Sequence, residues 1–178
     1  TKIRLFHSLD LIKNDYVIRA VGSEIELDRF YGNTDSFSVV KELIELSEPV
    51  SNSKTLFIWP EGIIPNMNQT ELKKFEYIFN QKFNEKHLIG LGITNFKRNE
   101  NKDEYYNSFS FYDHKLNLIN SYNKVKLVPF GEFVPFEEIL GKVGLKSLTN
   151  NYQSFSSGKN RNIISIIEND LSIKILPL

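Results

Sequence analysis

Short apolar runs that alternate with a helical pattern are the feature that most constrains the fold of this chain. Residues 16–21 (YVIRAV) and 55–59 (TLFIW) are rich in β-branched and aromatic residues, which is typical of buried strands. Between them, four apolar residues recur at helical spacing: Phe37, Val40, Leu43 and Ile44. Thr34 and Asp35 are available as caps for this helix. The pattern predicts a strand–helix–strand unit.

A second helix and a third strand are predicted next. Within residues 69–86, five apolar residues fall on one helical face: Leu72, Phe75, Ile78, Phe79 and Phe83. Asn68, followed three residues later by Glu71, resembles a capping box at the start of this helix. Residues 87–94 (HLIGLGIT) form another short apolar run, and its two glycines allow a bulge or a close backbone approach.

The second half of the chain favours hairpins. Residues 95–104 are polar and are predicted to form an exposed loop. Turn-forming residues are then twice flanked by β-branched and aromatic runs, so 106–112 is expected to pair with 118–122, and 163–167 with 171–175. Because helices alternate with strands early and hairpins follow, the predicted fold class is α/β, with a mixed sheet packed against helices.

Length and charge limit the classes of protein to consider. The chain has 178 residues and is 40% hydrophobic, which predicts one domain over residues 1–178. Lys plus Arg and Asp plus Glu both number 22, so no net charge favours a nucleic-acid partner. No apolar run approaches the roughly 20 residues that a membrane-spanning helix needs. The start shows neither Met nor a signal-peptide pattern, so we expect a piece of a longer protein.

Cysteine and histidine usage argues against metal and disulfide chemistry. The sequence has no cysteine, which excludes disulfides, thiolate zinc sites and a cysteine nucleophile within these residues. Three scattered histidines, His7, His87 and His114, show no ligand spacing and are expected at the surface or in packing roles. We expect no metal site and no cofactor.

The first motif with chemical potential is Trp59-Pro60-Glu61-Gly62, which follows directly on a predicted strand. Glu61 is thereby presented where a strand ends, at the edge where open α/β folds tend to place their sites. Pro60 fixes its own φ, and Gly62 lets the backbone turn, which would hold the carboxylate in one orientation. Glu61 is a candidate base, and a solvated surface carboxylate is the alternative.

The second motif is residues 122–135 (YNKVKLVPFGEFVP), in which prolines and a glycine hold charged residues in an apolar setting. Lys124, Lys126 and Glu132 are its charged side chains. Apolar surroundings make unpaired charges costly and tune their chemistry. A salt-bridged strand and turn without chemical function is the alternative.

The two motifs in this order, WPEG and then YNKVKLVPFGEFVPFE, resemble the nitrilase superfamily, and specifically its apolipoprotein N-acyltransferase branch. The resemblance implies an α-β-β-α sandwich, incomplete at the C-terminus, and a Glu-Lys-Cys triad. By motif position, Glu61 matches the general base and Lys124 the lysine that stabilises the oxyanion. The motif separates Lys124 from Lys126, because two residues stand between the catalytic lysine and Leu-Val-Pro-Phe-Gly-Glu. Glu132 matches a further family glutamate that would orient the lysine or share the proton traffic.

One family position departs from the pattern, and another is expected beyond the given residues. A tryptophan expected downstream of the first strand is replaced by Tyr31, a candidate substrate-binding residue or a packing aromatic. The nucleophilic cysteine follows a short apolar strand in the family, and the strand at 171–175 corresponds to it. We therefore expect the cysteine beyond Leu178, so that these residues alone would be inactive.

The resemblance also implies a reaction, partners and a location. The expected enzyme moves an acyl chain from a phospholipid to the N-terminal diacylglyceryl-cysteine of apolipoproteins through a cysteine thioester. It would lie on the periplasmic face of the bacterial inner membrane, held by transmembrane helices outside this sequence. Residues 136–162 are the least regular segment and read as a functional loop or as an ordinary surface helix plus loop. Apolar residues at 136–145 could face lipid.

Two other readings stay open. A soluble carbon–nitrogen hydrolase, an amidase or nitrilase, would share the triad and the fold, although the VPFGEFVPFE run is typical of the acyltransferase branch. A catalytically dead binding domain would explain the absent cysteine, although Glu61, Lys124 and Glu132 are all retained.

Overall fold

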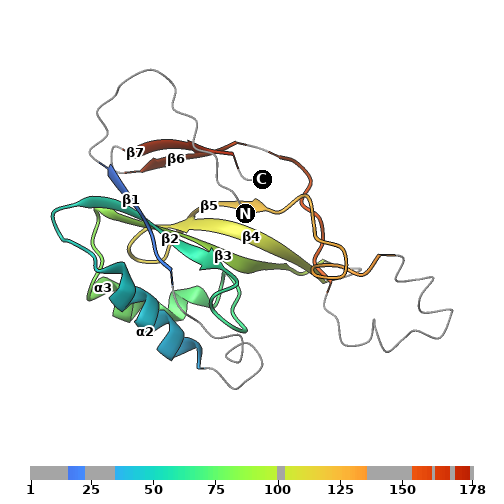
Figure 1. Cartoon of the computed structure of the whole chain (residues 1–178), viewed down its shortest axis with the longest axis horizontal. Coiled ribbons are helices and arrows are strands. Elements are labelled where there is room, and N and C mark those ends of the chain that lie inside the picture. Colours follow the sequence, from blue (N-terminus) through green and yellow to red (C-terminus); the bar gives the residue numbers. More distant parts are fainter. Residues whose placement is uncertain are drawn as a thin grey trace.

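The computed structural model describes residues 16–22, 35–99, 103–135, 154–161, 163–168 and 171–176 (Figure 1). A five-stranded mixed sheet carries helices on one face and a two-stranded hairpin on the other. The predicted α/β class is therefore confirmed. Tyr31 and the segment 136–145 lie outside the described residues.

The main sheet has the strand order β1-β2-β3-β4-β5, with the first three strands parallel and the last two added antiparallel. Its strands are β1 (Tyr16–Ala20), β2 (Lys54–Glu61), β3 (His87–Lys97), β4 (Glu104–Tyr112) and β5 (Leu118–Asn123). All five lie where strands were predicted. The loop predicted at 95–104 is too long at both ends. Asn95, Phe96 and Lys97 still belong to β3 and pair with β4, and β4 already begins at Glu104. The longer ladder satisfies backbone groups and brings the rings of Phe96 and Tyr105 into a tilted contact, with centroids 5.0 Å apart.

Helix α2 (Ser36–Ser47) confirms the first predicted helix. Of the two candidate caps, Asp35 accepts hydrogen bonds from the backbone N–H groups of Phe37 and Ser38. The helix buries one apolar face against the sheet, made of Val39, Val40, Leu43 and Ile44. Phe37, which was predicted on that face, is 48% exposed.

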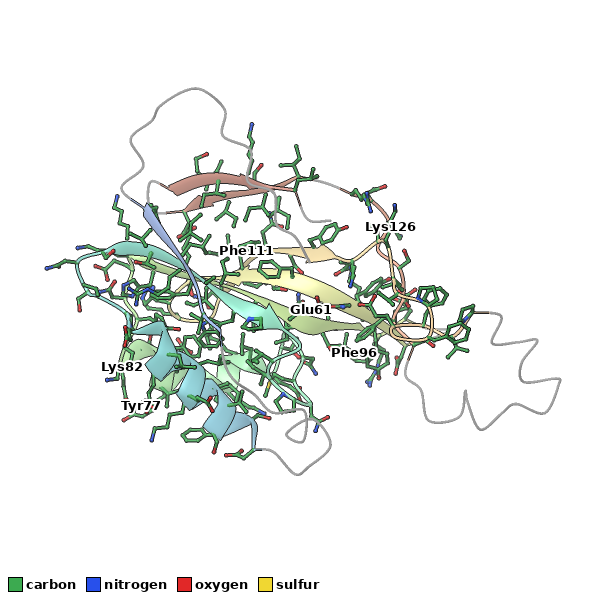
Figure 2. All side chains as sticks on the ribbon, in the orientation of Figure 1. Glu61, Tyr77, Lys82, Phe96, Phe111 and Lys126 are labelled. Atoms are coloured by element: carbon green, nitrogen blue, oxygen red, sulfur yellow. The ribbon has the colours of Figure 1, made fainter. Side chains whose placement is uncertain are left out.

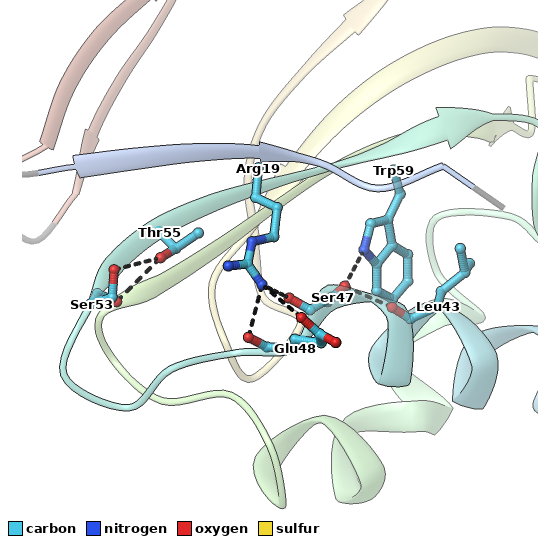
Figure 3. Close-up of polar contacts among 7 residues, drawn as sticks. All are labelled: Arg19, Leu43, Ser47, Glu48, Ser53, Thr55 and Trp59. Carbon is cyan, nitrogen blue, oxygen red and sulfur yellow. Dashed lines mark hydrogen bonds and ion pairs between the residues drawn. The ribbon is translucent and has the colours of Figure 1, made fainter.

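The end of α2 is tied to the sheet by polar contacts (Figure 3). Ser47 Oγ accepts a hydrogen bond from Trp59 Nε1 at 2.9 Å and donates one to the Leu43 carbonyl at 2.7 Å. The Arg19 guanidinium on β1 donates to the Ser47 and Glu48 carbonyls, two of the acceptors that a helix end leaves unpaired. These contacts fix α2 beneath β1 and β2.

The second predicted helix is mostly wrong. Instead of one helix over 69–86, the chain forms a 3-10 turn η1 (Leu72–Phe75) and a short helix α3 (Glu76–Asn80). The capping box is confirmed, since Asn68 and Glu71 each accept a hydrogen bond from the other's backbone N–H. Asn84 ends the helical path, because its side chain accepts from the Lys86 N–H while its own N–H donates to His87 Nδ1. The predicted apolar residues Leu72, Phe75, Phe79 and Phe83 are nevertheless buried. Among the described ranges, no helix is long and apolar enough to cross a membrane.

The second predicted hairpin is confirmed as β6 (Ile164–Glu168) and β7 (Leu171–Ile175), which pair antiparallel. It covers the face of the sheet opposite the helices, and Figure 2 shows Phe111 between the two layers. The apolar residues buried there are Leu56, Leu88, Phe111, Tyr122, Ile164, Ile166 and Ile175. Asn120 Nδ2 on β5 donates to the Ser165 carbonyl at 3.1 Å. The described residues thus form three layers: helices, sheet and hairpin.

Candidate active site

A β-bulge at the end of β2 directs Glu61 toward the hairpin side of the sheet. Phe57 and Trp59 face the helices, while Leu56 and Ile58 face the hairpin. Continued alternation would send residue 61 to the helix side. However, Trp59 pairs with Leu91 and Glu61 with the very next residue, so Pro60 is an extra residue without a partner on β3. A proline suits this place because it has no N–H to leave unpaired.

Glycines make room for the turn that follows. The Cβ of an alanine at Gly92 would lie 2.6 Å from Glu61 Cα, so the close approach of β3 to the bulge needs a glycine. Gly62 has a φ of +63°, in the left-handed region that favours glycine, and its N–H donates to the Gly92 carbonyl at 3.3 Å. The Glu61 backbone is therefore held on both sides, and its side chain remains 46% exposed.

Lys124 lies between two carboxylates. Its Nζ is 2.8 Å from Glu132 Oε1 and 3.6 Å from Glu61 Oε1. Its backbone N–H donates to the Asn107 carbonyl at 2.8 Å, which extends the pairing of β5 with β4 by one residue beyond Asn123. The Lys124 side chain is 21% exposed. Three of the four predicted site residues, Glu61, Lys124 and Glu132, are thus in contact.

Glu132 is anchored inside a tight loop. Its Oε2 accepts from the Val128 N–H at 2.7 Å, and its own N–H donates to the Val128 carbonyl at 2.8 Å. The Glu132 carbonyl accepts from the Phe155 N–H at 2.8 Å. Phe155 belongs to segment 154–158, which bonds β4 at Tyr105 and the Lys124 carbonyl through Gly158. The part of the irregular segment that is described therefore braces the site.

Asn107 on β4 joins the two glutamates and was not singled out by the sequence. Its Nδ2 donates to Glu61 Oε1 and to Glu132 Oε1, each at 2.5 Å. The sequence signal that could have identified Asn107 is the alternation of side chains along a strand. Asn107 lies on the same face of β4 as Phe109 and Phe111, which pack toward the hairpin. A single amide among aromatic residues on a partly buried face calls for a partner.

The surroundings shift the pKa values of the central pair in opposite directions. For Lys124, burial acts to lower the pKa, but the hydrogen bond to Glu132 and the negative charges of both glutamates outweigh it, so the pKa is raised. For Glu132, burial acts to raise the pKa, but hydrogen bonds from Lys124, Val128 N–H and Asn107 outweigh it, so the pKa is lowered. Both groups are held in their charged forms at neutral pH.

The arrangement separates the predicted roles of the charged groups. Glu132 is buried and accepts from three donors, so it is poorly placed to take a proton. Glu61 is half exposed, and it lies farther from Lys124 than Glu132 does. This exposure suits a general base, which must reach a reactant. Lys124 presents a fixed positive charge beside it, which can stabilise a developing oxyanion. Lys126, the alternative lysine, is exposed to solvent (Figure 2).

No place for a resident metal ion is evident in the part of the chain that the structure describes, where no three His, Asp or Glu side chains are grouped to hold one. His87 is buried between the rings of Phe57 and Phe83. Its Nε2 lies 3.1 Å from the Val50 carbonyl, and burial lowers its pKa. His87 therefore has a packing role, as predicted.

The chain matches no family model, but it has curated relatives. An apolipoprotein N-acyltransferase from Rhizobium rhizogenes is 30% identical over 142 residues, which is 76% of this chain and 25% of the relative. Another from Brucella suis is 25% identical over 155 residues, 84% of this chain and 29% of the relative. The chain thus matches only about a quarter to three tenths of the length of these relatives.

A search of solved structures finds an amidase from Nesterenkonia sp.. That structure is 11% identical to this chain, with a TM-score of 0.47. The superposition covers 84% of this chain and 51% of the amidase.

Proposed function

We propose that this chain, a sequence relative of part of the apolipoprotein N-acyltransferases, takes part in a two-step acyl transfer. Glu61 would be the general base, and Lys124 would stabilise the oxyanion. The contact of Lys124 with both Glu61 and Glu132 is the observation that carries the proposal. The acyl donor would be a phospholipid, and the acceptor the α-amine of the N-terminal diacylglyceryl-cysteine of an apolipoprotein. Residues 1–178 would belong to one domain of a longer protein.

In the first step, Glu61 takes the proton of a cysteine thiol, and the thiolate attacks the ester carbonyl of the phospholipid. Lys124 stabilises the oxyanion of the tetrahedral intermediate. The intermediate collapses to a thioester and expels the lysophospholipid alkoxide, which recovers the proton from Glu61. One ester bond breaks and one thioester bond forms.

In the second step, the α-amine of the acceptor attacks the thioester and gives its proton to Glu61. Lys124 again stabilises the oxyanion, and the thiolate leaves. The thiolate regains the proton from Glu61, so the enzyme returns to its starting state with an amide bond formed on the acceptor. Glu132 stays ionised throughout and holds Lys124 in place.

The nucleophile in this proposal is a cysteine outside the given sequence, which contains none. The direction of β7 supports a place after that strand. Ile175 pairs with Ile164 and is buried in the same apolar cluster against which Val125, the neighbour of Lys124, packs. This shared cluster supports a nucleophile placed after β7, on the same face of the sheet as Lys124.

The proposed substrates place the enzyme at a membrane. A phospholipid donor and a lipidated acceptor both reside in a bilayer, so the parent protein would act on the periplasmic face of the inner membrane. Residues 128–130 are exposed beside the anchored Glu132, and Phe130 is 72% exposed. This apolar tip supports a lipid-facing position for the loop. The role of Tyr31 in substrate binding remains a prediction.

Acyl-enzyme formation by the full-length protein tests the proposal. The protein is incubated with a phospholipid labelled in its acyl chain, and hydroxylamine-labile label on the protein is measured over time. Glu61→Gln should slow labelling by about 10²–10⁴-fold, the usual contribution of a general base. Lys124→Met should slow it by about 10²–10³-fold, as expected for the loss of an oxyanion donor.

Lys126→Met is the matched control, because it removes a lysine two residues away that is exposed. Its labelling rate should stay within a few-fold of the wild-type rate. Absence of label on the wild-type protein would refute the acyl-enzyme. Release of free fatty acid, with no transfer to a lipopeptide amine, would instead identify a hydrolase.

A further inference from the structure

Asn107 donates to both carboxylates of the site from one nitrogen atom. Its Nδ2 lies 2.5 Å from Glu61 Oε1 and 2.5 Å from Glu132 Oε1. A primary amide carries two N–H groups on that nitrogen, so each carboxylate can receive its own hydrogen. Serine or threonine at this place would offer a single donor, and an ionised aspartate none.

The backbone of Asn107 is fixed by neighbours on both sides. Asn107 pairs with Thr94 on β3, and its carbonyl accepts from the Lys124 N–H. It therefore lies on an inner strand, with its side chain on the hairpin face like those of Phe109 and Phe111. Sites built on strands hold their groups more precisely than sites built on loops.

The two glutamates repel each other, so holding both in one cluster needs partners that offset the repulsion. Both Oε1 atoms face the same amide nitrogen, and Lys124 supplies one positive charge for two negative ones. Glu132 has two further donors, Lys124 Nζ and the Val128 N–H, which keep it in place. Glu61 forms an ion pair with Lys124 at 3.6 Å and accepts a shorter hydrogen bond from the Asn107 amide, so the amide is one of the groups that tie it to the cluster.

We propose that Asn107 is a positioning residue that holds Glu61 against the Lys124–Glu132 pair in the orientation the base needs. The proposal rests on the acyl transfer proposed above for its catalytic consequence, but its structural part stands on the two hydrogen bonds alone. Asn107 does not touch the reacting atoms. It acts through Glu61, and its loss should reduce the rate of the chemical step more than substrate binding.

Three variants of the full-length protein test the catalytic part. Asn107→Ala should slow acyl-enzyme formation by about 100-fold, the order expected for a misplaced catalytic group, with little change in KM. Asn107→Asp keeps the size but adds a third carboxylate, and should be at least as slow at pH 7. Asn120→Ala removes an asparagine on β5 that donates to the Ser165 carbonyl, and should stay within a few-fold of wild type.

The pH dependence separates positioning from simple damage to the fold. The carboxyl group introduced by Asn107→Asp regains one donor when it is protonated, so the ratio of that variant's rate to the rate of Asn107→Ala should rise as the pH falls. The charged groups that face this side chain are Glu61 from β2, Lys124 after β5 and Glu132 from the loop. All three are shared by both variants, so their own titration largely cancels in the ratio.

NMR of the full-length protein tests the structural part without any substrate. In Asn107→Ala, the Glu61 side chain should average over several rotamers, and the pKa of Glu132 should rise because it loses a donor. Asn120→Ala should leave both unchanged. A single Glu61 rotamer and an unchanged Glu132 pKa in Asn107→Ala would overturn the proposal. If these NMR changes occur but the wild-type enzyme forms no acyl-enzyme, the proposed function fails while the role of Asn107 in holding Glu61 stands.

Discussion

At the scale of single residues, the charges of the site stabilise the fold over a shared pH range, with Glu132 setting its acid limit and Lys124 its alkaline limit. The folded-state pKa of Glu132 lies below its ordinary value of 4.5, so its contribution is complete above that value and disappears as the pH falls through the lower folded-state pKa. The folded-state pKa of Lys124 lies above 10.5, so its contribution is complete below that value and disappears as the pH rises further. The pair is therefore fully formed at neutral pH.

Glu132→Gln should remove the acid-dependent part of this stabilisation. At pH 7 we expect a loss of about 2 kcal/mol in the free energy of unfolding, the usual worth of a hydrogen bond to a charged group. The difference between wild type and variant should shrink as the pH falls below 4.5, because wild-type Glu132 becomes protonated there. Urea unfolding at several pH values measures this difference.

Glu76→Gln is the matched control, since Glu76 pairs with Lys73 at 3.2 Å on the surface. Exposed pairs contribute little, so its loss should be under about 1 kcal/mol at every pH. A loss as large as that of Glu132→Gln would show that burial of the Lys124–Glu132 pair is not what matters.

The sequence predicted the charged residues of the site, but it did not predict the asparagine that links the two glutamates by hydrogen bonds. Glu61 and Lys124 stand in motifs whose prolines and glycines mark unusual backbone, and this signal is local. Asn107 carries no such mark, because Tyr106-Asn107-Ser108 reads as part of an ordinary strand. Its importance depends on which strands pair and on a bulge in β2, and neither is encoded near residue 107.

At the scale of elements, the bulge in β2 and a glycine in β3 together place Glu61. Gly92→Ala would put a Cβ 2.6 Å from Glu61 Cα and 3.0 Å from its Cβ, so the backbone of one strand must shift. We expect about 1–3 kcal/mol of destabilisation, as for other overpacked sites, and a displaced Glu61. Thermal unfolding and the acyl-enzyme assay measure the two effects.

Gly90→Ala provides the control on the same strand and face. Its Cβ would meet Phe111 Cε1 at 2.9 Å, a ring in the apolar layer rather than the backbone of the site. It should also destabilise the fold but leave labelling of the folded protein within a few-fold of wild type. Equal loss of labelling in both variants would argue against a specific role of Gly92.

The junction of α2 with β2 yields a second test at this scale. Ser47 and Trp59 are both buried, and Ser47→Ala would leave the Trp59 indole N–H without its acceptor (Figure 3). We expect a loss of about 1–3 kcal/mol in the free energy of unfolding, the cost of an unsatisfied buried donor. Ser53→Ala, which removes a partly buried contact with Thr55, should cost less. Similar losses would contradict the assignment.

Elements with strong periodic signals were predicted well, and the failures have local causes. The strands lie where β-branched runs predict them, because such residues suit a half-buried sheet. At the C-terminal end of the helix predicted over 69–86, Asn84 and His87 offer the backbone other hydrogen bonds, which an apolar periodicity does not register. Its apolar residues are buried all the same, since the core needs them in either conformation.

At the scale of the whole molecule, the hairpin β6–β7 covers the face of the sheet that carries the site. Ile166 is fully buried against that face, whereas its neighbour Ile167 is 78% exposed. Ile166→Ala should therefore lower the free energy of unfolding by about 2–4 kcal/mol, and Ile167→Ala by under about 0.5 kcal/mol. The two variants remove the same atoms one residue apart, so strand propensity largely cancels between them.

The hairpin also sets the environment of Lys124, because Val125 packs against the cluster that contains Ile164, Ile166 and Ile175. If the layers form one cooperative unit, urea unfolding of Ile166→Ala should stay a single transition with a lowered midpoint. Amide hydrogen exchange should then speed up in β5 as well as in β6. Faster exchange confined to β6 and β7 would show instead that the hairpin opens independently of the sheet, and that the site does not depend on this layer.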